Sequence, residues 1–231
     1  MKFTKSFRTS QITSIFIRIV FILLVFHILT IIVMMNVENK TVLKFMSIFY
    51  FDAERNFPST YSALAILFCA YLLWEISYLE IEKITLKSKY WKFLSLIFLC
   101  LAFDEYTSIH ENAGHVLKLF TEKVFPFHGW YIPVLILFGI IGLFFLRFFY
   151  QLPRITKLHF FYSIGVFILG AVVCDILSAI VLTNFETGLE KDLVIYTLIT
   201  LEELFEMLGI IIFMNALLKY LVNNLKRIKI K

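Results

Sequence analysis

The chain has 231 residues, of which 60% are hydrophobic, and its mean hydropathy is +0.85. Soluble domains are only about 45–50% apolar, so this composition excludes an ordinary soluble protein and predicts a polytopic membrane protein. The net charge of +5 is compatible with nucleic-acid binding, but the basic residues gather at the ends of apolar stretches, so we expect no nucleic-acid partner. The length predicts a single integral membrane domain over residues 1–231.

Six apolar stretches are long enough to cross a bilayer as helices, because a transmembrane helix needs roughly 20 apolar residues and a barrel strand about half as many. In chain order they cover approximately 12–36, 60–79, 91–115, 130–150, 159–184 and 193–222. The predicted fold class is therefore all-α, a bundle of about six transmembrane helices. The first stretch is long and lacks a small-residue cleavage site, so it is expected to be an uncleaved span.

The charged residues between these stretches predict the topology. Lysines and arginines lie mainly before the first stretch, between the second and third, after the fourth and at the C-terminus. The other three loops are mixed or acidic, and the last of them contains Glu186, Glu190 and Asp192. Because positively charged loops stay in the cytoplasm, both termini are expected to be cytoplasmic.

The loop over about 37–59 is the longest of the external loops. Pro58 favours an extended residue before it, and Ser59 or Thr60 is then placed to cap the second span. This polar segment, with Glu54 as an accessory residue, lies on the same side of the membrane as the acidic residues described next. Two interpretations stay open: a lid that folds over an acidic site, or an ordinary solvated loop.

The third stretch carries an unusual set of ionisable residues, Asp104, Glu105, His110, Glu111 and His115. Such groups at membrane depth are costly unless they face a cavity, a cation or one another. A continuous helix would place Asp104, Ser108, Glu111 and His115 in one stripe, because their spacings are 4, 3 and 4.

The fifth and sixth stretches add Asp175 and the trio Glu202, Glu203 and Glu206. With a rise of about 1.5 Å per residue, all these acids fall in the outer half of the bilayer. Glu202 and Glu206 are i,i+4 neighbours and share one helix face. The sequence therefore predicts one buried polar site, shared by the third, fifth and sixth spans and open, if at all, towards the outside.

A metal centre is the sharpest interpretation, because inward-facing carboxylates and imidazoles on several helices are the ingredients of di-iron and di-manganese sites, and also suit zinc. Its candidate ligands are Asp104, His110, Glu111, His115, Asp175, Glu202 and Glu206. Glu105 and Glu203 are candidate catalytic carboxylates, with Ser108 as an accessory residue. A metal-dependent hydrolase or oxidase acting on a lipid-like substrate is one function of such a site.

Two other functions fit the same residues. Buried acids and histidines also form proton relays and cation pathways, so a proton- or cation-coupled transporter is the main alternative. Against it, Glu75 is the clearest acidic residue in the inner half of the bundle. A non-catalytic scaffold held by a polar network is the third possibility. Whether the protein is an enzyme stays open at this point.

Other residues have simpler explanations. Gly165 and Gly170 are expected at close helix contacts. The cysteines fall within spans and lack metal-ligand spacing, so they are expected to be small buried residues; they are Cys69, Cys100 and Cys174. His27 and His159 are expected to be interface residues and not ligands.

Four segments together resemble an uncharacterised family of bacterial multipass membrane proteins: Phe51-Asp-Ala-Glu-Arg-Asn-Phe-Pro-Ser-Thr60, Phe103-Asp-Glu-Tyr-Thr-Ser-Ile-His-Glu111, Gly170-Ala-Val-Val-Cys-Asp175 and Leu201-Glu-Glu-Leu-Phe-Glu-Met-Leu-Gly209. That family has a Glu-x-Asn-x-Pro-Thr loop, an Asp-Glu…His-Glu span and a Glu-Glu-x-x-Glu-Met-x-Gly span. This chain departs from it at Ser59, where the family has threonine, and at Asp175, where it has glutamate. The resemblance implies a bacterial inner-membrane location and membrane lipids as neighbours, and it implies no activity.

Overall fold

The computed structural model describes residues 9–81, 87–109 and 131–229, and within these residues it is helical throughout, with no strand. The helices are α1 (Thr9–Asn36), α2 (Lys40–Met46), α3 (Phe57–Ile81), α4 (Lys87–Thr107), α6 (Tyr131–Tyr150), α7 (Arg154–Ile168), α8 (Asp175–Asn184) and α9 (Leu189–Lys229). A 3-10 turn, η1 (Ser47–Phe49), follows α2, and a π-helix, η2 (Leu169–Cys174), joins α7 to α8. The predicted all-α class is confirmed.

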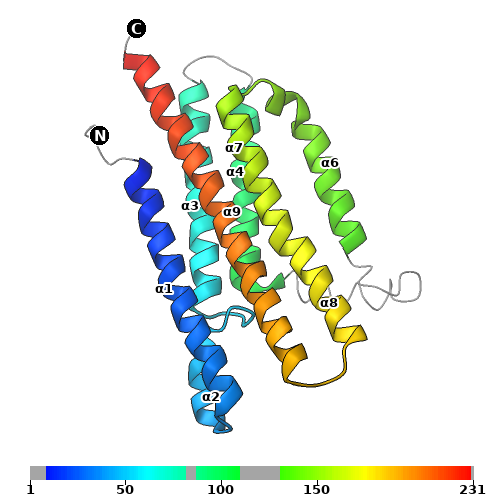
Figure 1. The fold of residues 1–231 in the computed structure, drawn as a ribbon. Helices are drawn as coiled ribbons and strands as arrows, with labels where there is room; N and C mark the ends of the chain where they lie inside the picture. Colours follow the sequence, from blue (N-terminus) through cyan, green and yellow to red (C-terminus); the bar gives the residue numbers. More distant parts are fainter. Residues whose placement is uncertain (1–8, 82–86, 110–130, 230–231) are drawn as a thin grey trace.

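The long helix α9 is the centre of the bundle. It packs against α1, α3, α7, η2 and α8, while α4 packs along α3 and α6 lies at the edge beside α4 (Figure 1). The fully buried side chains come largely from α3 and α9 and include Leu73, Ile76, Met207, Met214 and Leu217. This is the arrangement expected when two apolar helices form the core and the others surround them.

The outer faces of the surrounding helices are strongly apolar. Phe21 of α1, Leu143 of α6 and Phe161 of α7 are 64%, 72% and 68% exposed. Water-exposed surfaces of this kind are unfavourable, so these faces are suited to lipid. Four helical segments are long and apolar enough to cross a membrane: Thr9–Asn36, Phe57–Glu80, the continuous Arg154–Asn184 and Leu189–Asn224.

The six predicted spans correspond to α1, α3, α4, α6, the α7–η2–α8 segment and α9. The searched part of α6, Ile136–Tyr150, is a shorter apolar helix, and α4 is not among the four candidate spans. α1 begins and α9 ends towards the same end of the bundle (Figure 1). We call this the inner end, and we call the opposite end, where α2 and the α8–α9 connection lie, the outer end.

The prediction for the third span needs correction. A continuous helix was expected over 91–115, but α4 ends at Thr107, and Ser108 adopts a left-handed conformation with φ 57°. The amide of Ser108 closes the last turn by donating to the carbonyl of Asp104 at 2.7 Å. The helix that was expected to carry the stripe is therefore interrupted at Ser108. His110, Glu111 and His115 lie outside the described residues.

Candidate functional site

Carboxylates from four segments meet in the outer half of the bundle. Glu206 of α9 is in electrostatic contact with Glu105 of α4, with Asp175 of α8 and with Glu202 one turn away. Glu203 is in electrostatic contact with Glu105 and with Asp52 of the external loop, and Glu202 with Asp175 and Asp52. We call this set the outer acid cluster: Asp52, Glu105, Asp175, Glu202, Glu203 and Glu206.

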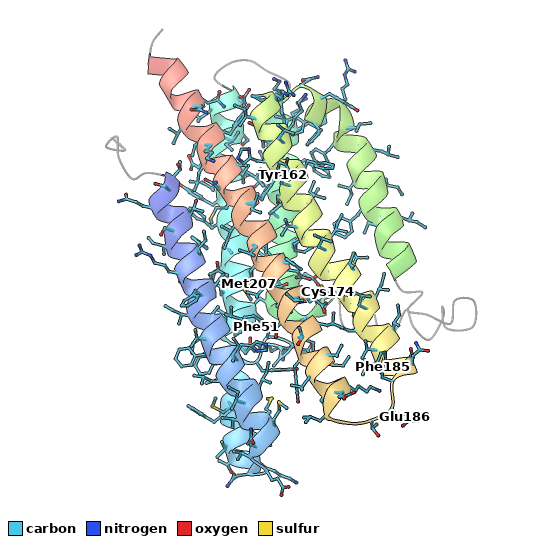
Figure 2. All side chains as sticks on the ribbon, viewed as in Figure 1. Phe51, Tyr162, Cys174, Phe185, Glu186 and Met207 are labelled. Carbon is cyan, nitrogen blue, oxygen red and sulfur yellow. The ribbon has the colours of Figure 1, made fainter. Side chains whose placement is uncertain are left out.

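The π-helix η2 leads directly into Asp175. A π-helix inserts an extra residue into an α-helix and so changes which face the following residues occupy. The carboxyl group of Asp175 follows this insertion and reaches Glu202 and Glu206. The charges of the same two glutamates act on Cys174, at the end of η2, which lies at the level of Met207 on α9 (Figure 2). Helix periodicity alone does not reveal this shift.

Glycine makes this contact possible. A Cβ atom on Gly170 would collide with the carbonyl oxygen of Glu202 and lie 3.1 Å from Cγ of Glu206, so the backbone of η2 touches α9 beside the acids. The predicted close contact at Gly170 is confirmed, whereas the one at Gly165 is wrong, since nothing lies within 4 Å of its position. Gly209 makes a contact that we did not predict, because a Cβ there would lie 2.9 Å from Cβ of Phe167.

The external loop reaches the cluster because His27 holds it. His27 of α1 is fully buried, and its Nδ1 accepts a hydrogen bond from the backbone N–H of Phe51 at 3.1 Å. Since Nδ1 is an acceptor, the ring proton is on Nε2, which donates to Oγ1 of Thr200 on α9 at 3.0 Å. The Phe51 ring stacks on His27 with centroids 4.0 Å apart. His27 is thus a structural residue that joins α1, the loop and α9.

The loop contributes an acid that was not predicted. Asp52, next to the anchored Phe51, acts on Glu202 and Glu203, and both Asp52 and the predicted Glu54 are exposed. Burial, together with the nearby charge of Asp52, raises the pKa of Tyr50 above its usual value, so this phenol stays neutral. The charge of Asp52 therefore acts on the glutamates of α9, and the lid interpretation stays a prediction.

The capping of α3 also differs from the prediction. Asn56, and not Ser59 or Thr60, is the cap: its Oδ1 accepts from the amide of Ser59 at 3.0 Å. The hydroxyl of Ser59 accepts in return from the amide of Asn56 at 3.0 Å. This reciprocal pair is a capping box in which serine replaces the usual glutamate.

The remaining predicted site residues divide into two groups. Asp104 is partly buried on α4 beside Glu105, and Ser108 is 4% exposed in its left-handed conformation. The predicted ligands His110, Glu111 and His115 lie outside the described residues. Within residues 9–81, 87–109 and 131–229, no three His, Cys, Asp or Glu side chains are arranged to hold a metal ion.

A hydroxyl near the cluster was missed in the sequence. Ser178, three residues after Asp175, is 8% exposed, and its Oγ has no hydrogen-bond partner within the described part of the chain. Buried hydroxyls are normally paired, so an unpaired one marks a place for a water molecule or an ion. The one sequence signal that could have identified Ser178 is its position about one helical turn after Asp175.

A second acidic position lies at the inner end. Glu80 of α3 is 4% exposed, and its Oε1 accepts a hydrogen bond from the hydroxyl of Tyr220 at 2.9 Å. Glu75, which sequence reasoning favoured, is only partly buried and bonds to Tyr71. Glu80 stands near the end of its apolar stretch, where an acidic residue ordinarily faces water, so no sequence pattern distinguishes it.

The comparisons with known proteins address the family. A family model described as a domain of unknown function, DUF8692, matches residues 16–221. The chain belongs to this family. No curated protein and no solved structure matches the chain.

The DUF8692 match extends across every member of the outer acid cluster, from Asp52 to Glu206. The expectation of an uncharacterised family is thereby confirmed, while a bacterial origin stays a prediction.

The electrostatics of the cluster restrict its chemistry. The charged groups that act on Glu202, Glu203 and Glu206 are all carboxylates, among the residues that the structure describes. Carboxylates whose charges act on one another cannot all stay ionised without compensation, so they share protons. Among the described residues, where no group of ligands is arranged to hold a metal ion, the arrangement can therefore hold and transfer protons.

Proposed function

We propose that this DUF8692 protein is an integral membrane protein that binds a divalent cation in the outer acid cluster. One observation supports this most strongly. Asp52, Glu105, Asp175 and the α9 glutamates come from four separate segments, yet the charges of the other acids act on the α9 glutamates. Bringing like charges together is costly, and a cation between them would offset that cost.

The coordination sphere would need ligands beyond the described acids. The residues that follow α4 include the predicted ligands His110, Glu111 and His115. The left-handed Ser108 turns the chain just before them, and strained backbone of this kind is common at functional sites. Mixed carboxylate and imidazole ligands favour zinc, iron or manganese over magnesium or calcium.

We propose hydrolysis or oxidation of a lipid-like substrate as the reaction. A divalent metal of this type supplies Lewis acidity or redox chemistry. Glu105 or Glu203 would serve as the proton acceptor, because both lie in the cluster on facing helices. We further propose six membrane spans with cytoplasmic termini. Because α4 packs along the candidate span α3, it occupies the same depth, and α6 lies beside it.

Metal analysis tests this proposal. Full-length protein is purified without added metal, and its zinc, iron and manganese are measured by mass spectrometry. We expect about one ion per chain or more, and a loss of at least half of it in Glu202→Gln and in Glu206→Gln. Glu186→Gln, at an exposed position on the α8–α9 connection, is the matched control and retains the metal. Less than about 0.1 ion per chain, unchanged by the variants, would overturn the proposal.

Proton- or cation-coupled transport is the second candidate. Glu80 favours it, because a buried carboxyl group at the inner end gives a pathway a second acidic position. The fully buried Met207, Met214 and Leu217 of α9 lie between the two acidic positions, so transport would require a rearrangement of the core. Substrate-dependent proton flux in proteoliposomes that Glu80→Gln abolishes would establish it in place of the metal site.

A further inference from the structure

Near the inner end, α3 and α4 carry five polar or aromatic side chains that we call the α3–α4 patch: Tyr71, Trp74, Glu75, Tyr78 and Lys92. The hydroxyl of Ser95 on α4 donates to the carbonyl of Ala70 on α3 at 2.7 Å, and this buried hydrogen bond fixes how the two helices lie against each other. About one turn closer to the inner end, the ammonium of Lys92 lies over the indole ring of Trp74, 4.9 Å from its centroid. The patch therefore joins side chains of both helices.

The aromatic members of the patch indicate its depth in the membrane. Tyr71 and Tyr78 are 50% and 54% exposed, and the rings of Trp74 and Tyr78 meet edge to face with their centroids 5.7 Å apart. Trp74 precedes Ile81, the last residue of α3, by about two turns, so it lies about 10 Å from the inner end of that helix. Tryptophan and tyrosine concentrate at the headgroup level of a bilayer, so we expect the α3–α4 patch at the membrane interface.

The patch contains one acidic and one basic group, and each of them has a neutral partner. Glu75, which is half-buried, accepts a hydrogen bond from the hydroxyl of Tyr71. The exposed ammonium of Lys92 has the indole ring of Trp74 as its partner. Ionisable groups on membrane helices usually pair with an opposite charge or mark a binding site. Since neither charge is neutralised by the described contacts, both are available to a charged ligand.

The two charges favour a ligand that carries both signs. An anionic headgroup would be attracted to Lys92 but repelled by Glu75, whereas a zwitterionic headgroup satisfies both. A primary ammonium donates hydrogen bonds to a carboxylate, and a quaternary ammonium has no N–H and prefers an open aromatic face. The indole of Trp74 is already in contact with Lys92, so the patch suits a primary ammonium better than a quaternary one.

We propose that the α3–α4 patch binds the headgroup of phosphatidylethanolamine, with the phosphate on the ammonium of Lys92 and the lipid ammonium on the carboxylate of Glu75. Tyr71 is a positioning residue, because its hydroxyl holds that carboxylate. A basic group between transmembrane helices near one membrane surface is a common element of lipid headgroup sites. This proposal does not depend on the outer acid cluster, which lies at the other end of the bundle.

Thermal stability of the full chain in a neutral detergent tests this proposal. Phosphatidylethanolamine, phosphatidylcholine and phosphatidylglycerol with identical acyl chains are titrated separately in mixed micelles. We expect a saturable rise in the melting temperature with phosphatidylethanolamine, at a midpoint concentration about tenfold lower than with either other lipid. Phosphatidylcholine shares the phosphate but lacks the N–H donors, and phosphatidylglycerol lacks the ammonium, so the pair separates the two halves of the site.

Variants distinguish the patch from general attraction between lipids and basic residues. Lys92→Gln should weaken the apparent affinity for phosphatidylethanolamine about tenfold, and Glu75→Gln should do the same while leaving the affinity for phosphatidylglycerol unchanged or stronger. Tyr71→Phe should weaken it about threefold, because the carboxylate is no longer held. Lys157→Gln is the matched control and should have no effect. Lys157 also lies over an aromatic ring near the inner end, 6.0 Å from the centroid of Tyr150, but the described residues of α6 and α7 include no acid.

Several outcomes would overturn this headgroup site. One is a response to phosphatidylethanolamine that is no stronger than the response to phosphatidylcholine or to phosphatidylglycerol. Another is a loss of affinity in Lys157→Gln that equals the loss in Lys92→Gln. A third is self-association of the chain in the same detergent that Glu75→Gln and Lys92→Gln abolish, because a second copy would then occupy the patch; size-exclusion chromatography with light scattering measures it. The melting temperatures of the lipid-free variants show whether each variant is folded.

Discussion

The outer and inner halves of one helix pair have opposite character. In the outer half, η2 and α8 press against α9, with Gly170 allowing backbone contact and carboxylates filling the contact region. In the inner half, the first turns of α7 and the last turns of α9 line a cavity whose residues include Lys219 and Thr156. The closest backbone contact therefore lies beside the outer acids, and the cavity lies at the other end of the same helices.

The acids at the two ends also differ in their partners. Glu80 at the inner end is stabilised by a neutral donor, the hydroxyl of Tyr220. Glu203 and Glu206 at the outer end have other carboxylates as their charged neighbours within the described residues. A buried acid with a donor is a structural element, whereas acids facing one another store unfavourable energy that a cation or a proton can release. This difference is why we assign function to the outer acids.

The largest effect is expected at the close contact itself. Gly170→Val should destabilise the protein by about 3 kcal/mol, because its side chain would collide with the backbone of α9 at Glu202. Gly165→Val is the matched control, and it should be nearly neutral, since its position is open. Thermal unfolding in detergent measures both. Equal losses for the two variants would show that η2 and α9 are not in contact.

Neutralising acids at the two ends should change stability in opposite directions. In metal-free protein, Glu206→Gln should stabilise by about 2 kcal/mol, because it removes repulsion from Glu105, Glu202 and Asp175. Glu80→Gln should destabilise by about 1 kcal/mol, because the hydroxyl of Tyr220 loses its carboxyl acceptor and an amide replaces it. Melting temperatures after chelation provide the measurement, at roughly 2–4 °C per kcal/mol for a chain of this size.

If the melting temperatures of Glu206→Gln and Glu80→Gln shifted in the same direction, the acids at the two ends would not differ in their effect on stability. If Glu206→Gln were destabilising, the outer acids would be a structural network, which is the scaffold interpretation.

Much of this fold is predictable from the sequence. The apolar stretches predicted every long helix of the described chain, because length and hydropathy are local properties. The prediction that Glu105, Asp175 and the α9 glutamates share one site rests on their common depth and on the cost of isolated charges in a membrane.

The features that the sequence analysis missed have a different cause, since each of them depends on a tertiary contact. The phase of Asp175 depends on the π-helix, which forms where Gly170 meets α9. Asp52 enters the cluster because a histidine distant in sequence, His27, binds the neighbouring amide. The end of α4 depends on a left-handed serine, a conformation that residues other than glycine seldom adopt. No local sequence pattern predicts the π-helix, the hydrogen bond from the loop to His27 or the end of α4.

The anchored loop provides the next prediction. His27→Phe keeps a ring for stacking on Phe51 but removes both hydrogen bonds, leaving the amide of Phe51 unpaired at a cost of about 1.5 kcal/mol. The loop should open more often, and trypsin should cleave after the exposed Arg55 about tenfold faster. His27→Asn offers an acceptor near the position of Nδ1 and should restore part of the protection. Unchanged cleavage in His27→Phe would mean that other contacts hold the loop.

The smallest effect is expected where the loop enters α3. Asn56→Ala removes the acceptor for the amide of Ser59 and should cost about 1 kcal/mol, while Asn56→Asp keeps that acceptor and should cost less. Asn39→Ala is the matched control, because Asn39 caps only α2, a helix of 7 residues with no buried side chain. Since α3 lies in the core and α2 does not, thermal unfolding should detect the loss at Asn56 and not at Asn39. If both variants unfold alike, the capping box does not contribute to the stability of α3, and the position of Asp52 depends on His27 alone.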